Sequence, residues 1–296
     1  MEFSKIFILG AGAVGSILGA LLSQRNDVTL VGNKDHVNAV RSNGLSISGD
    51  INKTFLVRTD TQIREMPQKT LIFLTTKTYD SEKAINAVIK LLRKDTVILV
   101  LQNGLGNEDT VKRIVGRRAK VLRGITTMAA EFLKLGEVRY WKGNIILEHD
   151  FAAKKVADIL NASTLEASLS KSINSKIWSK TVVNSVINPL TAIFRVRNCE
   201  IGSESLSSIR HQIVRECVRV GKAEGITLPK YLEQEIDSQI LAYTNFSSMY
   251  QDIVKGKMTE IDSLNGKIVE LGRKHHIPTP VNETLVHFIK FLEEKK

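Results

Sequence analysis

The first half of the chain alternates short apolar runs with amphipathic stretches. Runs this short and this continuous are typical of strands buried on both faces of a sheet. The predicted strands of this kind lie at residues 6–9, 27–31, 70–75 and 96–101. Helix-like segments at residues 13–24 and 81–92 separate them, so the pattern predicts β-α-β units and a parallel sheet. Further strands are predicted at 121–127, 138–141, 145–148 and 165–170, with a hairpin region at 45–60 and a helix at 152–160.

From about residue 173 onward the pattern becomes helical nearly throughout, and strand-like runs disappear. We therefore predict an α/β fold in two parts: a Rossmann-type dinucleotide-binding domain over residues 1–170 and an all-helical domain over 171–296. Three local signals predict where helices begin or end. Asn107 is a candidate cap, Thr259 with Asp262 resembles a capping box, and Pro189 should end or kink its helix.

Composition narrows the class of protein. The 296 residues are 43% hydrophobic and 25% charged, as in a globular protein. Cys199 and Cys217 have neither metal-ligand nor disulfide spacing, which fits a reducing cytoplasm and predicts no metal site. The net charge of +11 raises the question of nucleic acid, but the basic residues are scattered and no nucleic-acid-binding motif is present. A basic protein also suits anionic cofactors and substrates, so we expect a small-molecule ligand and no nucleic acid.

The strongest local motif is the glycine spacing that follows the first predicted strand. Gly10, Gly12 and Gly15 form G-x-G-x-x-G between a strand-like run and a helix-like run. Gly10 permits a tight turn, Gly12 lets a pyrophosphate approach the backbone, and Gly15 lets the helix pack close to the sheet. The intervening Ala11, Ala13 and Val14 complete the candidate phosphate-binding turn at a helix N-terminus. The glycines also argue against a membrane-spanning helix over residues 6–22.

Three further positions are candidates to face a dinucleotide. After the second strand come Gly32, Asn33 and Lys34, with no acidic residue to bind the ribose 2′-OH of NAD, which favours NADP. Lys34 can equally be an ordinary surface lysine. Lys77 and Asn103 each follow the end of a predicted parallel strand, where ligands of open α/β sheets bind.

The first helix of the second domain carries a polar stripe. Lys180, Asn184 and Asn188 are spaced at i, i+4 and i+8, which drifts by only about 80° around a helix. Amides with one cation suit a face turned toward a polar ligand, although hydrogen bonds between helices would explain them too. A later polar segment, residues 246–266, contains Glu260, which in isolation could simply complement a helix dipole.

Together these segments resemble the ketopantoate reductase (2-dehydropantoate 2-reductase) family. The resemblance rests on GAGAVG at 10–15, TTK at 75–77, QNGLGN at 102–107, KTVVNSVINPLTAI at 180–193 and SSMYQDIVKGKMTEIDSLNG at 247–266. It implies an N-terminal Rossmann domain, a helical C-terminal domain and an active site in the cleft between them.

The resemblance also implies roles for individual residues. Lys180 would be the general acid that protonates the C2 oxygen of the substrate as hydride arrives from nicotinamide C4, and Glu260 would hydrogen-bond and position the substrate. The remaining implied substrate contacts are Asn103, Asn184, Asn188, Asn198 and Ser248. Asn103 would also lie near the nicotinamide, and Lys77 near the adenosine phosphate.

The implied activity is NADPH-dependent reduction of 2-dehydropantoate to (R)-pantoate for coenzyme A synthesis, by a cytoplasmic homodimer. Two departures from the family pattern keep alternatives open. Gly32-Asn33-Lys34 stands where an arginine is frequent in the family, so NADH is possible. Arg195 and Arg197 place extra cations beside Asn198. A reductase of another branched 2-oxo acid, an opine-type dehydrogenase and a non-catalytic dinucleotide sensor are the alternatives.

Overall fold

The computed structural model describes residues 3–295. The chain forms two compact units. The first takes in the chain through Gln102 and again Gly106–Ile173, and the second takes in Asn103–Leu105 and the chain from Asn174 onward. A three-residue segment of the N-terminal half therefore belongs to the C-terminal unit.

The first unit is built on an eight-stranded sheet with strand order β12-β11-β8-β7-β6-β1-β2-β5. All neighbouring pairs in it are parallel except β11 with β8. The strands are β1 (Lys5–Leu9), β2 (Val28–Val31), β5 (Arg58–Asp60), β6 (Thr70–Leu74), β7 (Val97–Val100), β8 (Lys120–Thr126), β11 (Ile145–Glu148) and β12 (Ala167–Ser170). The predicted parallel β-α-β arrangement is confirmed.

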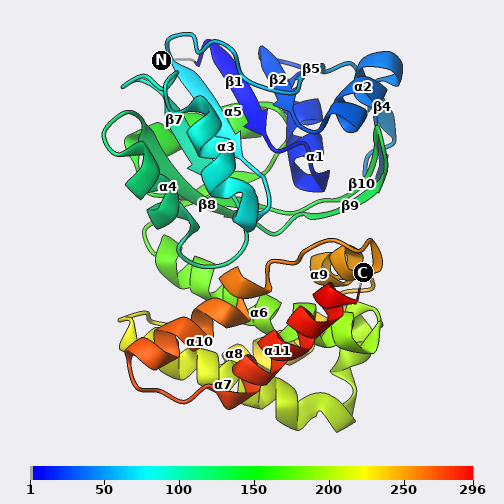
Figure 1. Ribbon diagram of the computed structural model, residues 1–296, viewed down its shortest axis with the longest axis vertical. Helices are drawn as coiled ribbons and strands as arrows, with labels where there is room; N and C mark the ends of the chain where they lie inside the picture. The colour runs from blue at the N-terminus through cyan, green and yellow to red at the C-terminus, as the bar shows by residue number, and fades with distance from the viewer. Residues whose placement is uncertain (1–2, 296) are drawn as a thin grey trace. The chain divides into compact units, whose positions relative to one another are not determined.

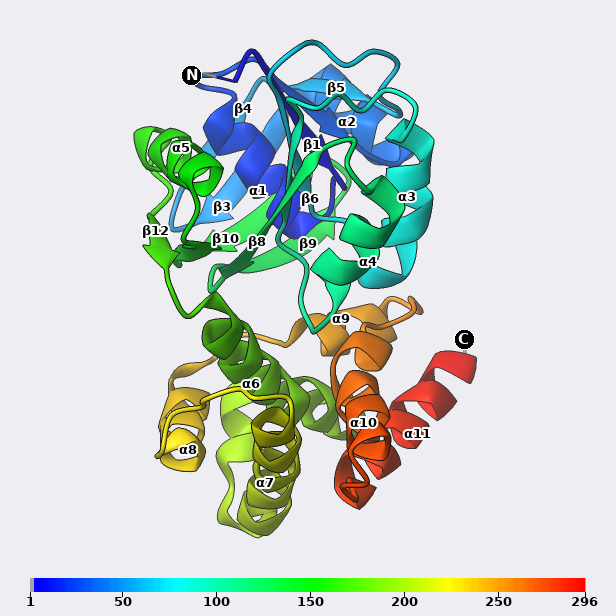
Figure 2. The same ribbon diagram turned by 90° about the vertical axis from the view of Figure 1, so that its left-hand side faces the viewer.

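Side-chain alternation along these strands divides the core between the two faces of the sheet. In β1, Ile6 and Ile8 belong to one buried cluster, and Phe7 and Leu9 belong to the other. Helices α1 (Ala13–Leu22) and α5 (Phe151–Ala162) cover the first face, and α3 (Ser81–Val88) and α4 (Asn107–Val115) cover the second (Figure 2). Burial on both faces explains why the strands read as continuous apolar runs.

A second, four-stranded sheet has the order β4-β3-β10-β9 and packs over α1. Its strands are β3 (Leu45–Gly49), β4 (Lys53–Phe55), β9 (Ala129–Lys134) and β10 (Glu137–Trp141), and α2 (Lys34–Asn43) precedes it (Figure 1). The predicted hairpin at 45–60 is confirmed for β3 and β4, while β5 joins the large sheet instead. Strand β9 was not predicted, because its burial is partial and its apolar residues do not alternate.

The second unit is helical, as predicted. Its helices are α6 (Ile173–Phe194), α7 (Ser207–Ala223), α8 (Leu232–Ala242), α9 (Ser248–Val254), α10 (Asn265–Lys274) and α11 (Pro280–Glu294), with short 3₁₀ turns η2 (Asn198–Gly202), η3 (Glu204–Leu206) and η4 (Ile261–Ser263). Helix α7 packs against α8, α10 and α11 (Figure 1). No helix in residues 3–295 is long and apolar enough to cross a membrane.

Two predicted helix starts are wrong. Gly106, in a left-handed conformation, is the N-cap of α4, and Asn107 is its first helical residue. Thr259 does accept a hydrogen bond from the Ile261 amide (3.2 Å), but it starts only the 3₁₀ turn η4. Helix α10 begins afterwards, at Asn265.

Of the two outcomes predicted for Pro189, an end or a kink of its helix, the end is wrong. The helix continues through Pro189 to Phe194. Proline removes the hydrogen bond from residue 189 to the carbonyl of residue 185, which normally disfavours a helix interior. Here the Ser185 carbonyl accepts instead from the side-chain amide of Asn265, and the helix continues with an outside donor.

Candidate functional site

The glycine-rich turn lies where the parallel strands end together. Leu9 pairs with Val31 on one side and Leu74 on the other, and Leu74 pairs with Val100. The segments that follow β1, β2, β6 and β7 therefore leave the sheet at one edge. This is the edge at which open α/β sheets bind their ligands.

The three motif glycines meet different surroundings. Gly10 has φ of +121°, and a Cβ there would lie 2.4 Å from the Thr76 nitrogen. A Cβ on Gly15 would lie 2.0 Å from the Gly10 carbonyl oxygen, so this glycine allows α1 to pack on the turn. Gly12, the N-cap of α1, is exposed, and a Cβ there would meet no described atom within 4 Å. The turn is thus tight inside and open at Gly12 and the start of α1, which fits a pyrophosphate approaching the helix N-terminus.

The second strand ends against this turn. A Cβ on Gly32 would lie 2.3 Å from the Ala11 Cβ, so the missing side chain lets the two loops touch. Asn33 is the N-cap of α2 and Lys34 its first residue, and both are exposed. Lys77 follows β6 as the N-cap of a 3₁₀ turn (η1, Thr78–Asp80). Asn33, Lys34 and Lys77 all follow strands at the edge of the sheet that was predicted from the sequence.

A buried arginine, which the sequence analysis missed, fixes the end of β7. Arg123 of β8 is 2% exposed, and its Nη1 donates to the Gln102 carbonyl oxygen at 3.0 Å. Its Nε lies 3.4 Å from a Glu108 carboxylate oxygen. Burial lowers the pKa of Arg123, and the nearby carboxylates of Glu108, Asp109 and Glu148 oppose that shift. A charged residue inside an otherwise apolar strand was the signal available in the sequence.

The segment after Gln102 brings two predicted site residues together. Lys180 Nζ, from α6, donates to Asn103 Oδ1 at 2.8 Å. Two residues later the Leu105 amide donates to the Ser263 carbonyl oxygen at 3.0 Å. Gly104 between them has φ of +89°, and a Cβ there would lie 2.3 Å from that same oxygen. The close approach of Gly104 to the Ser263 carbonyl oxygen holds Asn103 beside Lys180.

The amides of the polar stripe lie along α6 beyond Lys180. Asn184 is partly exposed, whereas Asn188 is 5% exposed. Asn198 begins η2 and is also 5% exposed, and its Oδ1 is buried with no hydrogen-bond partner among the described residues. Ser248 is the first residue of α9.

Hydrogen bonds connect the elements that carry these residues. Thr191 Oγ1 on α6 lies 2.7 Å from Ser247 Oγ, the cap of α9, and the Asn198 amide donates to the Asn245 carbonyl oxygen at 3.1 Å. Residues from α6, η2 and the start of α9 therefore belong to one polar region of the helical unit. An amide-rich region of this kind can hold hydroxyl and carboxylate groups through hydrogen bonds.

Glu260 lies on the same segment as the residue that holds the Asn103 loop. It is the N-cap of η4 and is 7% exposed. Its carbonyl oxygen accepts from the Ser263 amide (3.1 Å) and from Ser263 Oγ (3.0 Å). The helix-dipole alternative for Glu260 requires a helix that starts beside it, and α10 starts only at Asn265.

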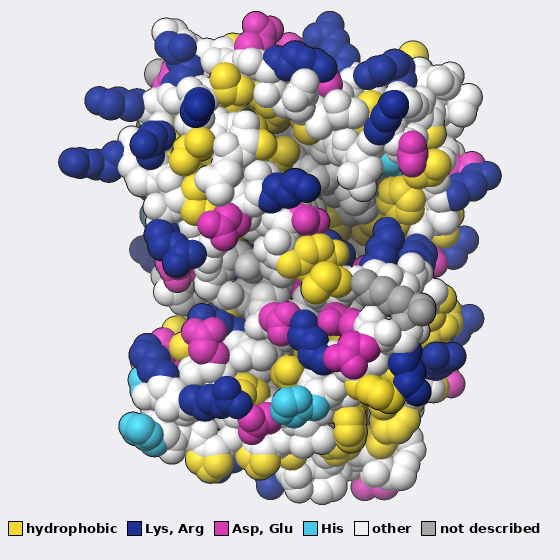
Figure 3. Space-filling view, in the orientation of Figure 1, with side chains coloured by type: hydrophobic (Ala, Val, Ile, Leu, Met, Phe, Trp, Pro, Cys, Tyr) yellow, Lys and Arg dark blue, Asp and Glu magenta, His cyan; other side chains and the backbone are white. Residues whose placement is uncertain are grey.

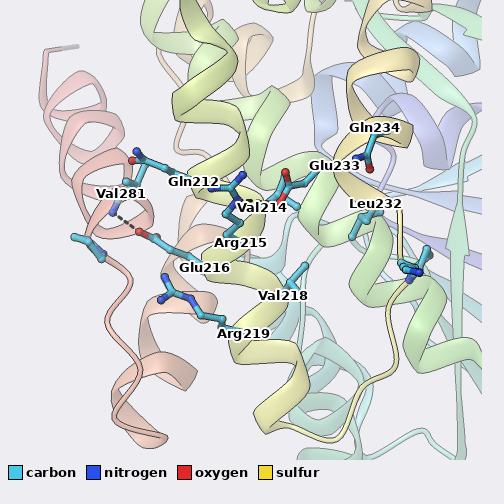
Figure 4. A pocket seen from close by; sticks show the side chains of 13 residues that line it. Gln212, Val214, Arg215, Glu216, Val218, Arg219, Leu232, Glu233, Gln234 and Val281 are labelled. Atoms are coloured by element: carbon cyan, nitrogen blue, oxygen red, sulfur yellow. Dashed lines mark hydrogen bonds and ion pairs between the residues drawn. The ribbon is translucent and has the colours of Figure 1, made fainter.

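A groove in the helical unit lies at a different place. It has a volume of about 700 Å³ and lies between α7, the start of α8 and the start of α11 (Figure 4). Arg215 and Glu233 line it and form an ion pair at 3.2 Å. Lys180, Asn103 and Glu260 are not among the described residues that line it. On the face shown in Figure 3, basic side chains are dispersed among acidic ones rather than gathered into one patch.

Both units match families of known proteins. Residues 6–148 match the family described as "Ketopantoate reductase PanE/ApbA", and residues 172–293 match "Ketopantoate reductase PanE/ApbA C terminal". The chain is also 37% identical to the 2-dehydropantoate 2-reductase of Pyrococcus horikoshii, over 98% of this chain and 97% of that protein. The chain belongs to the ketopantoate reductase family. The resemblance noted in the sequence is confirmed.

Two solved structures of the same fold extend the comparison. D-mandelate dehydrogenase, solved with NADH and anilino(oxo)acetate, is 32% identical with a TM-score of 0.91, over 98% of this chain and 99% of that one. A dimeric ketopantoate reductase from Staphylococcus aureus has a TM-score of 0.84 at 21% identity, over 98% and 99% of the two chains. The predicted fold, a Rossmann-type unit followed by a helical one, is confirmed.

Proposed function

We propose that this chain reduces 2-dehydropantoate to (R)-pantoate with NADPH, and that Lys180 is the general acid. The single observation that carries the proposal is the 2.8 Å hydrogen bond from Lys180 Nζ to Asn103 Oδ1. It holds an ammonium group against Asn103, on the segment of the chain that comes after β7. Family membership supplies the reaction class.

The proposed roles follow from the chemistry of each group. Bound NADPH would supply the hydride to C2 of the substrate. Lys180 gives the proton that converts the C2 oxygen to a hydroxyl, and Asn103 orients the ammonium for that transfer. Asn184, Asn188, Asn198 and Ser248 bind the hydroxyl and carboxylate groups, and Glu260 positions the substrate. The overall change consumes one hydride and one proton for each ketone reduced.

The proposed cofactor site uses the glycine turn and two lysines. The turn from Gly10 to Gly15 would hold the pyrophosphate at the start of α1, where backbone N–H groups favour negative charge. Asn33, Lys34 and Lys77 would hold the 2′-phosphate of NADPH. NADH remains a possible cofactor, since D-mandelate dehydrogenase was solved with it.

The test is reduced-nicotinamide oxidation with 2-dehydropantoate, with NADPH and NADH compared in parallel. We expect wild-type turnover with NADPH and a fall in kcat of about 10²- to 10⁴-fold in Lys180→Ala. Lys176→Ala is the matched control, because Lys176 lies one turn earlier on α6 and is exposed. Equal use of NADH would refute the phosphate roles of Lys34 and Lys77. Tight NADPH binding without turnover would refute the substrate assignment.

A second candidate is a dehydrogenase acting on another 2-hydroxy acid with NADH. Identity to D-mandelate dehydrogenase favours it, because 32% is close to the 37% shared with the Pyrococcus enzyme. Arg195 and Arg197, next to Asn198, could also favour a different acid. A panel of branched and aromatic 2-oxo acids, compared by kcat/KM, separates the two candidates.

We further propose a cytoplasmic homodimer. The Staphylococcus aureus ketopantoate reductase of the same fold is described as dimeric, and both cysteines of this chain are free thiols. Sedimentation velocity at several concentrations tests the dimer directly.

A further inference from the structure

The proline within α6 leaves one helix carbonyl that no backbone group of the helix can satisfy. Residue 189 would normally donate its N–H to the carbonyl of residue 185, but Pro189 has none. Instead Asn265 Nδ2 donates to the Ser185 carbonyl oxygen at 2.9 Å, and Asn265 is fully buried. A carbonyl can only accept, so the nitrogen of this amide must face it. Asn265 thus supplies the donor that Pro189 removes.

The Asn265 amide is also part of a buried hydrogen-bond network. Its Nδ2 also donates to Asn282 Oδ1 at 2.9 Å, and Asn282 Nδ2 donates to Glu216 Oε2 at 2.7 Å. The same carboxylate accepts from the backbone amide of Val281 at the start of α11 (Figure 4) and from that of Asn282. The side chain that meets Ser185 is therefore tied to α7 and α11.

These contacts form a closed ring of hydrogen bonds and short chain segments that includes Lys180. Going round it, Lys180 donates to Asn103, the Leu105 amide donates to the Ser263 carbonyl, and Asn265, two residues after Ser263, donates to Ser185. Ser185 and Lys180 lie on the same helix, about 7.5 Å apart along its axis. We call this set the Lys180 ring. All its members belong to the helical unit.

We propose that Asn265 is a positioning residue for the reaction proposed above: it fixes α6 against the 260–265 segment, and thereby holds Lys180 at Asn103. The inference rests on Lys180 being the proton donor. Without the Asn265 bond, the Ser185 carbonyl is buried without a donor, and α6 loses the hydrogen bond that joins it to Asn265. A displacement of about 1 Å at a reacting group can cost 10²-fold in rate. Asn265 itself touches no reacting atom.

The experiment is a double-mutant cycle between Asn265→Leu and Pro189→Ala. Alanine at 189 restores the backbone N–H that bonds to the Ser185 carbonyl, so it replaces the function assigned to Asn265. We expect Asn265→Leu alone to lower kcat about 10- to 100-fold. In the Pro189→Ala background the same substitution should lower it less than threefold. Equal losses of kcat in the two backgrounds would overturn the proposal.

Two further measurements separate positioning from general destabilisation. Asn282→Ala is the matched control, since it removes a neighbouring partner of Asn265 but leaves the bond to Ser185. We expect it to lower Tm as Asn265→Leu does, with kcat within about threefold of wild type. A loss of kcat as large as that of Asn265→Leu would attribute the effect to destabilisation and overturn the proposal.

The pH profile gives a second readout. In Asn265→Leu the alkaline fall of kcat should move to lower pH, because the ammonium loses its hydrogen bond to Asn103. An unmoved profile would contradict the ring. If wild type itself fails to reduce any 2-oxo acid, the proposed function is refuted and the ring is tested separately. The double-mutant cycle is then measured by hydrogen exchange of the α6 backbone amides. Protection that is lost in Asn265→Leu and regained when Pro189→Ala is added supports the ring.

Discussion

Gly104→Ala should damage activity much more than stability, because this glycine has two separate reasons to lack a side chain. Its φ of +89° costs an alanine about 1–2 kcal/mol. Its Cβ would also lie 2.3 Å from the Ser263 carbonyl oxygen, whereas ordinary contacts start at 3.4 Å. The backbone atoms involved must therefore separate by about 1 Å, and that separation acts directly on Asn103 and its bond to Lys180.

The expected magnitude follows from that displacement. A shift of about 1 Å at a positioned group costs on the order of 10²-fold, so kcat/KM should fall by about that factor. The strain alone should lower Tm by only a few degrees, at roughly 2–4 °C per kcal/mol for a chain of this size class. Steady-state reductase assays and differential scanning calorimetry measure the two effects.

Gly225→Ala is the matched control. Gly225 follows α7 with φ of +74°, and a Cβ there would meet no described atom within 4 Å. The control therefore carries the backbone strain without the close contact. We expect a similar loss of Tm and near-wild-type kcat/KM. Equal activity in the two variants would refute the role given to the approach of Gly104 to Ser263.

Two further predictions concern titratable groups. His36 is buried; its Nδ1 accepts from the Gly136 amide, and its Nε2 contacts Ser16 Oγ. Burial lowers the pKa of His36. As the pH falls, the unfolded chain therefore binds a proton at His36 before the folded chain does. The stability due to neutral His36 should be complete above pH 6.5 and lost as pH falls below it, and urea titrations from pH 7.5 to 5 should show a weaker dependence in His36→Gln. Burial, with Glu216 nearby, raises the pKa of Cys217 to about 12. A thiol reagent at pH 8 should therefore modify only Cys199 in the folded protein and both cysteines in urea, and rapid labelling of two thiols in the native state would contradict this.

The fold was predictable because its signals are local and periodic. Apolar runs of strand length, the glycine spacing at residues 10–15 and the change to helical periodicity each lie within one element. They predicted the parallel sheet, the turn after β1 and the helical second unit. The polar stripe of α6 was visible for the same reason, because Lys180, Asn184 and Asn188 share one face of a single helix.

The parts that were missed depend on contacts between distant segments. The sequence around Asn103 indicated the end of a strand, but not that residues 103–105 belong to the helical unit. Pro189 predicts the end of a helix unless a donor comes from elsewhere, and that donor, Asn265, lies 76 residues later in the chain (265 − 189). Local propensity cannot contain that information. Thr259 likewise signalled a start of helical structure, but only the 3₁₀ turn η4 follows it, and α10 begins after the buried Leu264.

The hydrogen bond from Lys180 to Asn103 bears on the proposed role of Lys180. A carboxylate at the position of Asn103 would attract the ammonium by about 4 kcal/mol at 4 Å and an effective dielectric constant of 20. That attraction is equivalent to about three units of pKa, so it would hold the proton that an acid catalyst has to release. An amide oxygen accepts the same hydrogen bond at 2.8 Å without a full charge. It fixes where the proton points and holds that proton less strongly than a carboxylate would. An amide partner at Asn103 therefore suits the role of proton donor that we propose for Lys180.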